Sequence, residues 1–235
     1  MSLNVNYLYH YFYHWDERHA APSLEILRAF VGGIETDIAN SIVEFQRAEF
    51  ETEVIEVDDE IPPLVVSFFH GLDDASWDLD ELFLKHYPSM RRSSTLLIIV
   101  ASLEDEVNLL CHNAKRHRKY EISFQDLTGN GLHRAVDYLT KVCGLQGIKQ
   151  ADSWSELMRI CQLRNKIAHA GGKIKKGDAI LSYIDSRADL STASIYRLYE
   201  DTRINLEKGY LEHVLGTIAV FYRHLGDCIR TVKWD

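Results

Sequence analysis

The chain has 235 residues and a net charge of −9, and hydrophobic residues make up 46% of it. This length and apolar content suit one domain with an appendage or two small domains sharing a core, and only 4 prolines and 13 glycines argue against long low-complexity stretches. The acidic excess argues against a uniformly basic surface that coats nucleic acid regardless of sequence, but it leaves room for a local basic patch.

Residues 1–88 are expected to form an N-terminal helical extension packed on the main body. The aromatic segment 7–15 indicates a short docking helix. Pro22 and Ser23 are typical of a helix start, and the helix that follows is predicted to run to about residue 54. After an acidic, proline-containing connection, further helical pieces are expected over 64–71 and 78–86.

Residues 89–235 are expected to form the main helical domain. Pro88 and Ser89 indicate the start of a long helix over 90–114. Its apolar residues recur at helical spacing and predict a buried stripe of Leu96, Ile99, Val100, Leu103, Val107, Leu110 and Cys111.

Further elements are predicted after this helix. A helix is expected over 123–142, broken near its start by glycines, and a long amphipathic helix over 205–234 closes the chain. Between them lies a helix capped by Asp152-Ser153 and ended by Gly171-Gly172, and the short alternating runs 179–184 and 193–198 indicate a β-hairpin. The fold class is therefore mainly α.

Composition also indicates where the protein acts. No apolar run approaches the roughly 20 residues that span a bilayer, and no basic stretch followed by an apolar one opens the chain, so a cytoplasmic protein without a membrane partner is expected. The four cysteines are scattered without a CxxC pair and are interpreted as small core residues of a reducing compartment. No cofactor is expected, because P-loop, GxGxxG and GxSxG motifs are absent.

One histidine pair and three basic runs have a mainly structural interpretation. His10 and His14 have helical metal-ligand spacing, but the HExxH signature is missing and the surrounding aromatic residues favour packing. The basic runs at Arg91-Arg92, 115–119 and 173–176, each considered alone, are typical of solvated faces and helix ends.

Arg164 is the residue that local patterning does not explain. At about 100° per residue, the helix after Asp152 has one apolar arc, and Arg164 falls inside it. A guanidinium on a core-facing stripe is costly unless it is paired or faces a polar cleft. Glu104, at the margin of the predicted stripe of the 90–114 helix, is the best acidic candidate to orient it, and Ser102 and Asn108 are weaker polar candidates.

Asn165 and His169 lie one turn apart at the edge of the same arc. Asn165 can therefore hydrogen-bond His169 and help to set its tautomer. Arg164 and His169 point about 140° apart on a regular helix, so they converge only if the helix loosens at its end or if the pocket lies at a contact between helices or subunits. The structural alternative is a buried Arg–Glu pair that fixes helix register while His169 caps the helix end.

The pattern Arg164-Asn165-x-x-x-His169, at the end of a helix and preceded by a helix with an inward acid, resembles the HEPN superfamily, whose motif is Arg-x(4–6)-His. The resemblance covers roughly residues 89–234. It implies a HEPN-like all-α bundle, commonly a dimer that brings two motifs together. Many members are metal-independent endoribonucleases of toxin, antiviral-defence or RNA-processing systems, and others are non-catalytic or bind nucleotides.

The residue types suit RNA cleavage through attack by the ribose 2′-hydroxyl. His169 can act as base or acid near neutral pH, and Arg164 can stabilise the extra phosphoryl charge. One histidine per motif favours a homodimer. The expected partners are RNA, a second copy and an antitoxin or defence protein; the alternative is a non-catalytic interaction or nucleotide-binding module with the same fold. The candidate RNA-binding residues are Lys173, Lys175, Lys176 and Arg116.

Overall fold

The computed structural model describes residues 11–56, 63–194, 202–232 and 234, and it is mainly helical, with 67% helix and 11% strand. The chain divides into two compact units, each assembled from segments that are distant in sequence. Unit 1 comprises Met1–Val31, Leu96–Arg164 and Leu211–Asp235, and unit 2 comprises Gly32–Thr95 and Asn165–Tyr210. The boundary expected between residues 88 and 89 falls inside helix α4 (Tyr87–Arg118).

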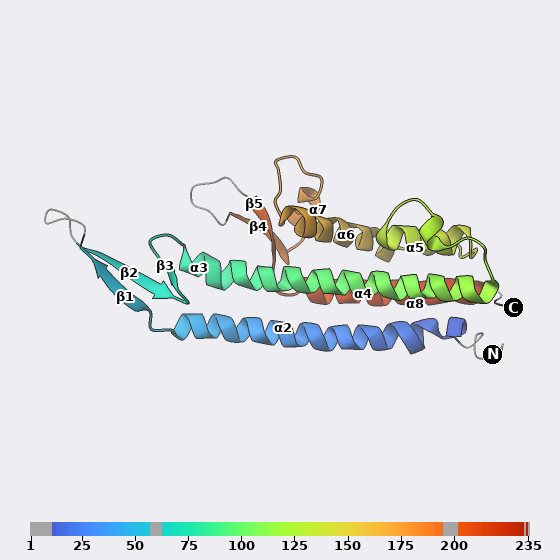
Figure 1. Cartoon of the computed structure of the whole chain (residues 1–235), viewed down its shortest axis with the longest axis horizontal. Coiled ribbons are helices and arrows are strands. Elements are labelled where there is room, and N and C mark those ends of the chain that lie inside the picture. The colour runs from blue at the N-terminus through green and yellow to red at the C-terminus, as the bar shows by residue number, and fades with distance from the viewer. Residues whose placement is uncertain (1–10, 57–62, 195–201, 233, 235) are drawn as a thin grey trace. The chain divides into compact units, whose positions relative to one another are not determined.

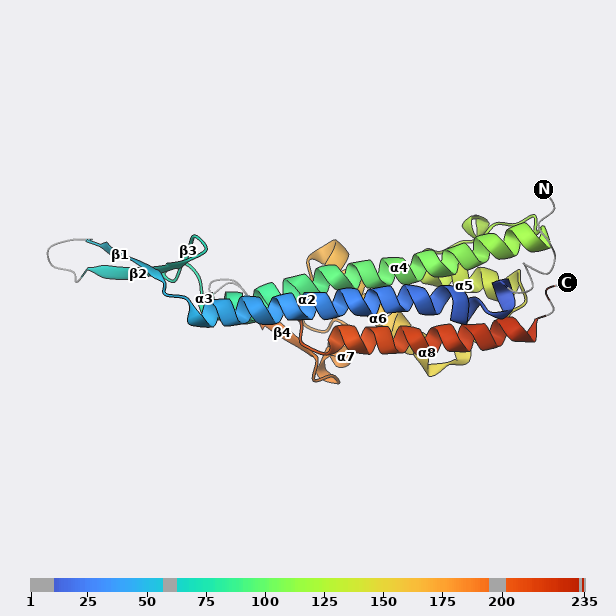
Figure 2. The same ribbon diagram turned by 90° about the horizontal axis from the view of Figure 1, so that it is seen from below.

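Unit 1 is a helical bundle. It holds the first part of α2 (Ala21–Arg47), most of α4, all of α5 (Gly131–Lys141), and most of α6 (Asp152–Ala170) and α8 (Tyr210–Thr231). Within this unit α4 and α8 lie side by side, with α5 and α6 on one face of the pair and the start of α2 on the other (Figures 1 and 2). All seven residues of the predicted α4 stripe are completely buried, so that prediction is confirmed.

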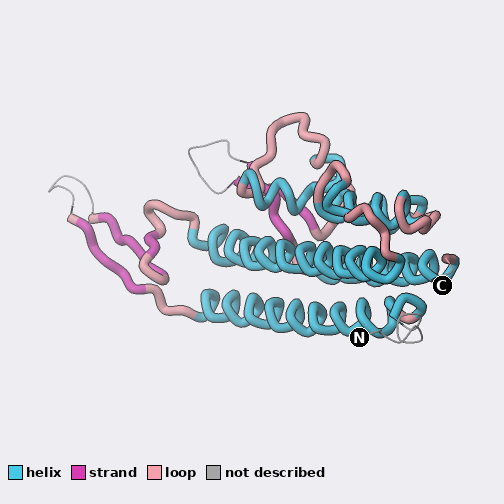
Figure 3. The backbone as a smooth tube through the Cα atoms, turned by 45° about the vertical axis from the view of Figure 1, so that its right-hand side comes forward, coloured by secondary structure: helices cyan, strands magenta, loops and turns pink. Residues whose placement is uncertain are grey.

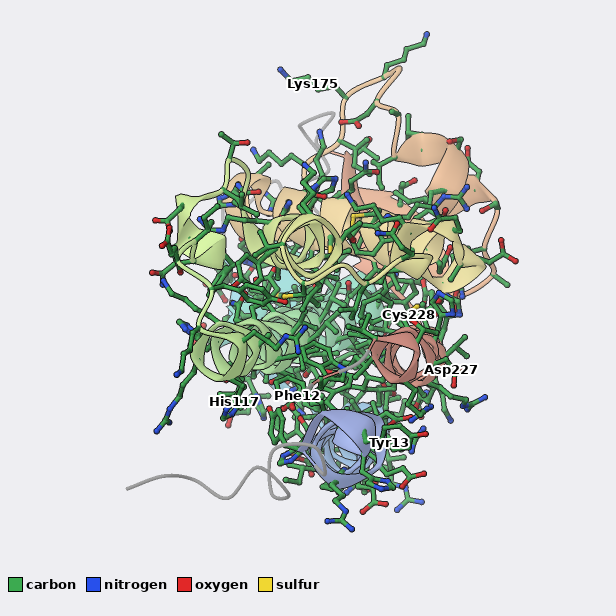
Figure 4. All side chains as sticks on the ribbon, turned by 90° about the vertical axis from the view of Figure 1, so that its right-hand side faces the viewer. Phe12, Tyr13, His117, Lys175, Asp227 and Cys228 are labelled. Carbon is green, nitrogen blue, oxygen red and sulfur yellow. The ribbon has the colours of Figure 1, made fainter. Side chains whose placement is uncertain are left out.

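Aromatic side chains dock the N-terminal segment on unit 1. Phe12 stacks on Trp234, with ring centroids 4.2 Å apart, and lies edge-on to His117 (Figure 4). Trp15 is completely buried. The expected docking is therefore confirmed for residues 11–15, while residues 7–10 lie outside the described part of the chain.

Two helices begin earlier than predicted, and each has a proline inside it. A π-helical turn, Asp16–Ala20, leads into α2 ahead of Pro22, and another, Leu82–His86, leads from the short helix α3 (Leu79–Glu81) into α4 ahead of Pro88. Proline has no N–H to donate within a helix, and π-helix, although rare, occurs mostly as single turns inside longer α-helices. Both prolines therefore lie inside helices instead of opening them.

Unit 2 contains a three-stranded antiparallel sheet where helix was predicted. Strands β1 (Glu51–Ile55), β2 (Leu64–Phe69) and β3 (Leu72–Asp73) are ordered β1-β2-β3, and Glu51 pairs with Phe68 (Figure 3). Helix α2 ends at Arg47. The helical predictions for 51–54 and 64–71 are wrong. Short runs have no period that separates helix from strand, and the β-branched and aromatic residues among them favour strand.

A second hairpin follows the motif helix. Strands β4 (Leu190–Ser194) and β5 (Thr202–Leu206) pair antiparallel, with Leu190 opposite Leu206. An antiparallel strand pair after the motif helix is therefore confirmed. The first predicted strand, 179–184, is wrong, since helix α7 (Leu181–Asp185) occupies that segment, and the second, 193–198, overlaps β4 only at 193–194, because 195–198 lie outside the described residues.

The two remaining helix predictions are too long at their N-terminal ends. A single 3₁₀ turn, Phe124–Asp126, precedes α5, which starts only at Gly131. The closing helix begins at Tyr210, because residues 205 and 206 belong to β5. In the described part of the chain, no helix combines the length and apolar character needed to cross a membrane.

A buried ion pair holds unit 2 together. Arg92 is only 6% exposed, and its Nε and Nη2 donate to the two carboxylate oxygens of Glu35 at 2.7 and 2.8 Å. Its Nη1 donates to the carbonyl of Leu206 at 3.2 Å. Arg92 is therefore a core residue that links α2, α4 and β5, whereas the neighbouring Arg91 is exposed.

Candidate functional site

The motif occupies the last turns of α6, and the helix ends immediately after it. Gly171 and Gly172 have φ values of 58° and 75°, in the left-handed region that favours glycine. The N–H of Gly172 donates to the carbonyl of Lys166, six residues earlier, at 3.1 Å, and this bond satisfies one of the carbonyls left free at the end of the helix. The predicted helix end is confirmed.

Arg164 pairs with Glu104, as the sequence predicts. Its Nη2 donates to Oε1 of Glu104 at 2.5 Å, and the two side chains are 19% and 24% exposed. Both residues belong to unit 1, Arg164 on α6 and Glu104 on α4. Ser102 and Asn108, the weaker candidates, make no hydrogen bond with Arg164 among the described residues.

The guanidinium keeps one buried donor unused. Nε of Arg164 is buried and has no hydrogen-bond partner within the described part of the chain. One turn earlier, burial raises the pKa of the Cys161 thiol to about 11; Glu104 raises it further and Arg164 opposes the shift. The Cys161 thiol therefore stays neutral at physiological pH, next to the charged Arg164–Glu104 pair.

Gly131, predicted only to interrupt a helix, allows the carboxylate of Glu104 to approach the start of α5. Gly131, the first residue of α5, has φ +54°, and a Cβ there would lie 2.7 Å from Oε1 of Glu104. Only glycine suits both the backbone conformation and the close approach. The carboxylate therefore lies at the N-terminus of α5, where the partial positive charge of the helix stabilises an anion.

Asn165 and His169 are both exposed. The hydrogen bond expected between them does not occur among the described residues, so the structure gives Asn165 no role in fixing the histidine ring. His169 is open to solvent at the helix end, while Arg164 is mostly covered. The motif thus combines an accessible imidazole with a guanidinium held in place by a carboxylate.

The three lysines of the candidate RNA-binding run are exposed on the segment after α6. Lys175 points away from the protein (Figure 4). The start of this segment runs along β5, where Ile174 N–H donates to Thr202 at 2.9 Å, and Lys166 pairs with Asp178 further along. The lysines Lys173, Lys175 and Lys176 belong to unit 2, whereas Arg116, also exposed, lies near the end of α4 in unit 1.

Arg203, which is not among the residues predicted for the site, also lies near the motif. A Cβ on Gly171 would lie 3.8 Å from Nη1 of Arg203, so this guanidinium lies beside the end of α6. Burial lowers the pKa of His86, and the positive charge of Arg203 lowers it further. Arg203 does not belong to a basic run of the sequence. The pairing of its strand with the segment after α6 brings it close to the motif.

The described residues contain no group of three or more His, Cys, Asp and Glu side chains arranged to hold a metal ion. His10 lies outside the described residues, and His14 has its Nδ1 3.2 Å from Oε2 of Glu17. All four cysteines are free. Comparisons with family models, curated proteins and solved structures find no match to this chain.

Proposed function

We propose that this protein is a HEPN-type endoribonuclease that cleaves RNA without a metal ion, with Arg164 and His169 as its catalytic residues. The observation that carries the proposal is the state of Arg164. Its guanidinium is mostly buried, held at 2.5 Å by Glu104 and left with an unused buried donor, and an exposed histidine ends the same helix.

The chemistry follows from these residue types. His169 removes the proton of a ribose 2′-hydroxyl, and the oxygen attacks the adjacent phosphorus. The bond from phosphorus to the 5′-oxygen breaks, leaving a cyclic 2′,3′-phosphate, and an acid returns a proton to the 5′-oxygen. Arg164 stabilises the charge that builds up on the phosphoryl oxygens, because its planar donors match their geometry.

A homodimer supplies the second proton-transfer group in this proposal. One motif carries one histidine, and Arg164 and His169 diverge by about 140° on a regular helix. A second copy related by two-fold symmetry would provide the acid from its own His169. Arg203 and the lysines after α6 would add positive charge that neutralises phosphates along the RNA. Because the whole protein carries a net charge of −9, such neutralisation requires a local basic patch.

The test compares substitutions at the two catalytic residues. His169→Ala should lower the single-turnover cleavage rate by about 10²–10⁴-fold, the usual contribution of general acid–base catalysis. Its melting temperature should stay unchanged, because the side chain is exposed. His112→Ala, which removes an exposed histidine of α4, is the matched control and should cleave normally. Arg164→Lys keeps the charge but loses the planar fork, so it should cleave slowly while remaining folded.

The competing interpretation, in which Arg164 and Glu104 only fix helix register in a non-catalytic module, makes the opposite prediction. Breaking a buried pair costs about 3–5 kcal/mol, so Arg164→Lys would then unfold readily. His169→Ala would change nothing measured. An unstable Arg164→Lys beside a fully active His169→Ala contradicts the ribonuclease proposal.

A further inference from the structure

A small pocket in unit 2 has no place in the proposed cleavage reaction. It has a volume of about 140 Å³ and lies among the second half of α2, the turn between β2 and β3, and the start of α4. Sites for drug-sized ligands enclose about 300–1,000 Å³, so this pocket suits a single planar ring system. The lining residues that matter for its chemistry are Phe69, His70, Phe83, Tyr87, Glu44 and Arg91.

Aromatic rings form the walls of the pocket. The rings of Phe69 and His70 stack at 4.3 Å with 8° between their planes, and Phe83 lies edge-on to Phe69 at 4.7 Å and to Tyr87 at 4.9 Å. Phe83 is in turn stacked on buried Phe45 at 5.0 Å. Because the core fixes these rings, the pocket is preorganised for a flat aromatic ligand.

His70 occupies a position where the turn itself favours another residue. Phe69 pairs with Leu72, so His70 and Gly71 form a two-residue hairpin loop, with φ values of 49° and 75°. Such loops prefer Asn-Gly or Gly-Gly, because both positions need positive φ. A histidine here adopts a sparsely populated conformation, and such conformations gather at ligand sites. The conformation of the turn does not account for a histidine at position 70, whereas its ring stacks on Phe69 and extends the aromatic wall of the pocket.

Two charged side chains stand at the rim. The Glu44 carboxylate has its Oε1 3.8 Å from Nε2 of His70, and its side chain is 66% exposed. Arg91 is exposed, and its guanidinium makes no ion pair with any described residue. The rim therefore offers a hydrogen-bond acceptor and a free cation beside an aromatic slot. If the ligand were an apolar side chain, it would bind neither charged group, and if it were a simple anion, it would not stack on the aromatic rings.

We propose that this pocket binds the base of a nucleotide. The base lies against the aromatic walls, Glu44 accepts a hydrogen bond from a ring or exocyclic N–H, and Arg91 binds the attached phosphate. Aromatic stacking accepts any base, since every base has a π face. The inference goes beyond the proposed function, because no residue of α6 lines the pocket, and the ligand is either a free mononucleotide or an unstacked base of single-stranded RNA.

The experiment measures binding of adenosine, adenosine monophosphate, uridine monophosphate and ribose 5-phosphate to the full chain by calorimetry. Binding of a labelled hexa-adenylate is measured by fluorescence anisotropy. The key variant is His70→Asn, which suits the turn conformation and removes the ring. It should weaken base-containing ligands by about 5–100-fold, the range expected for one aromatic stack. Arg91→Gln should weaken the nucleotides but not adenosine, and Arg28→Gln, an exposed arginine of unit 1, is the control.

The outcomes distinguish a mononucleotide site from a site for an RNA base, and both from a pocket that binds no base. Binding of both monophosphates but not of ribose 5-phosphate supports a mononucleotide site. Binding of the hexamer alone, weakened by His70→Asn, supports an RNA base. Equal binding of ribose 5-phosphate and nucleotides, or no effect of His70→Asn on any ligand, overturns the proposal. His169→Ala should leave binding intact, so loss of cleavage and loss of this site are distinguishable.

Discussion

A methyl group added at Gly131 would press against the carboxylate that holds Arg164. The new Cβ would lie 2.7 Å from Oε1 of Glu104, on a backbone with φ +54°. The left-handed conformation costs an alanine about 1–2 kcal/mol. The carboxylate can move aside because it ends a flexible side chain, but it then loses its charged hydrogen bond to Arg164, worth about 1.5–3 kcal/mol. We therefore expect Gly131→Ala to lower the free energy of unfolding by about 3–4 kcal/mol.

Gly144→Ala is the matched control. Gly144 also has positive φ, +78°, but a Cβ there would meet nothing within 4 Å. Only the backbone cost remains, so the loss should be about 1–2 kcal/mol. Urea denaturation followed by circular dichroism measures both variants, and in thermal melts each kcal/mol should lower the midpoint by about 2–4 °C for a chain of this size.

A third variant tests whether the larger loss of unfolding free energy in Gly131→Ala comes from the Arg164–Glu104 ion pair. In a Glu104→Ala background the carboxylate is gone, so Gly131→Ala should cost no more than Gly144→Ala does. Two results would refute the reasoning. One is an equal loss for Gly131→Ala and Gly144→Ala in the wild-type background, and the other is an excess that persists without Glu104.

RNA cleavage should persist in EDTA, and a loss that magnesium restores would contradict the metal-free mechanism. Replacing Lys173, Lys175 and Lys176 together with glutamine should reduce the salt slope of RNA binding by about 2 without lowering the unfolding midpoint, since all three are exposed; unchanged affinity would remove them from the site. Light scattering at micromolar concentration should give the mass of a dimer, and a strict monomer would count against the shared site. Burial raises the pKa of the Cys143 thiol from 9.0 to about 12, so the unfolded thiol ionises first and stability should fall as pH rises above 9.0, a decline that Cys143→Ala should reduce.

The sequence alone determined the features that depend on local periodicity. The buried stripe of α4 and the glycine end of α6 follow from helical spacing and from the conformations that glycine permits. The pairing of Arg164 with Glu104 was also predictable, because a guanidinium inside an apolar arc needs a partner and Glu104 lies at the margin of the facing stripe. Each of these inferences used the periodicity of single helices and one physical requirement, and the Arg164–Glu104 pairing combined the patterns of two helices.

Only the tertiary structure decided the features that depend on contacts between distant residues. Strand β1 forms by pairing with β2, with Glu51 opposite Phe68, and the period of neither short run distinguishes strand from helix. Arg92 lies in a basic run that is typical of a solvated face, yet Glu35 neutralises it in the core, across 57 residues of sequence. Gly131 looks like any helix breaker until the carboxylate of Glu104 is placed against it. In all three cases the deciding energy comes from a partner whose position the local sequence does not encode.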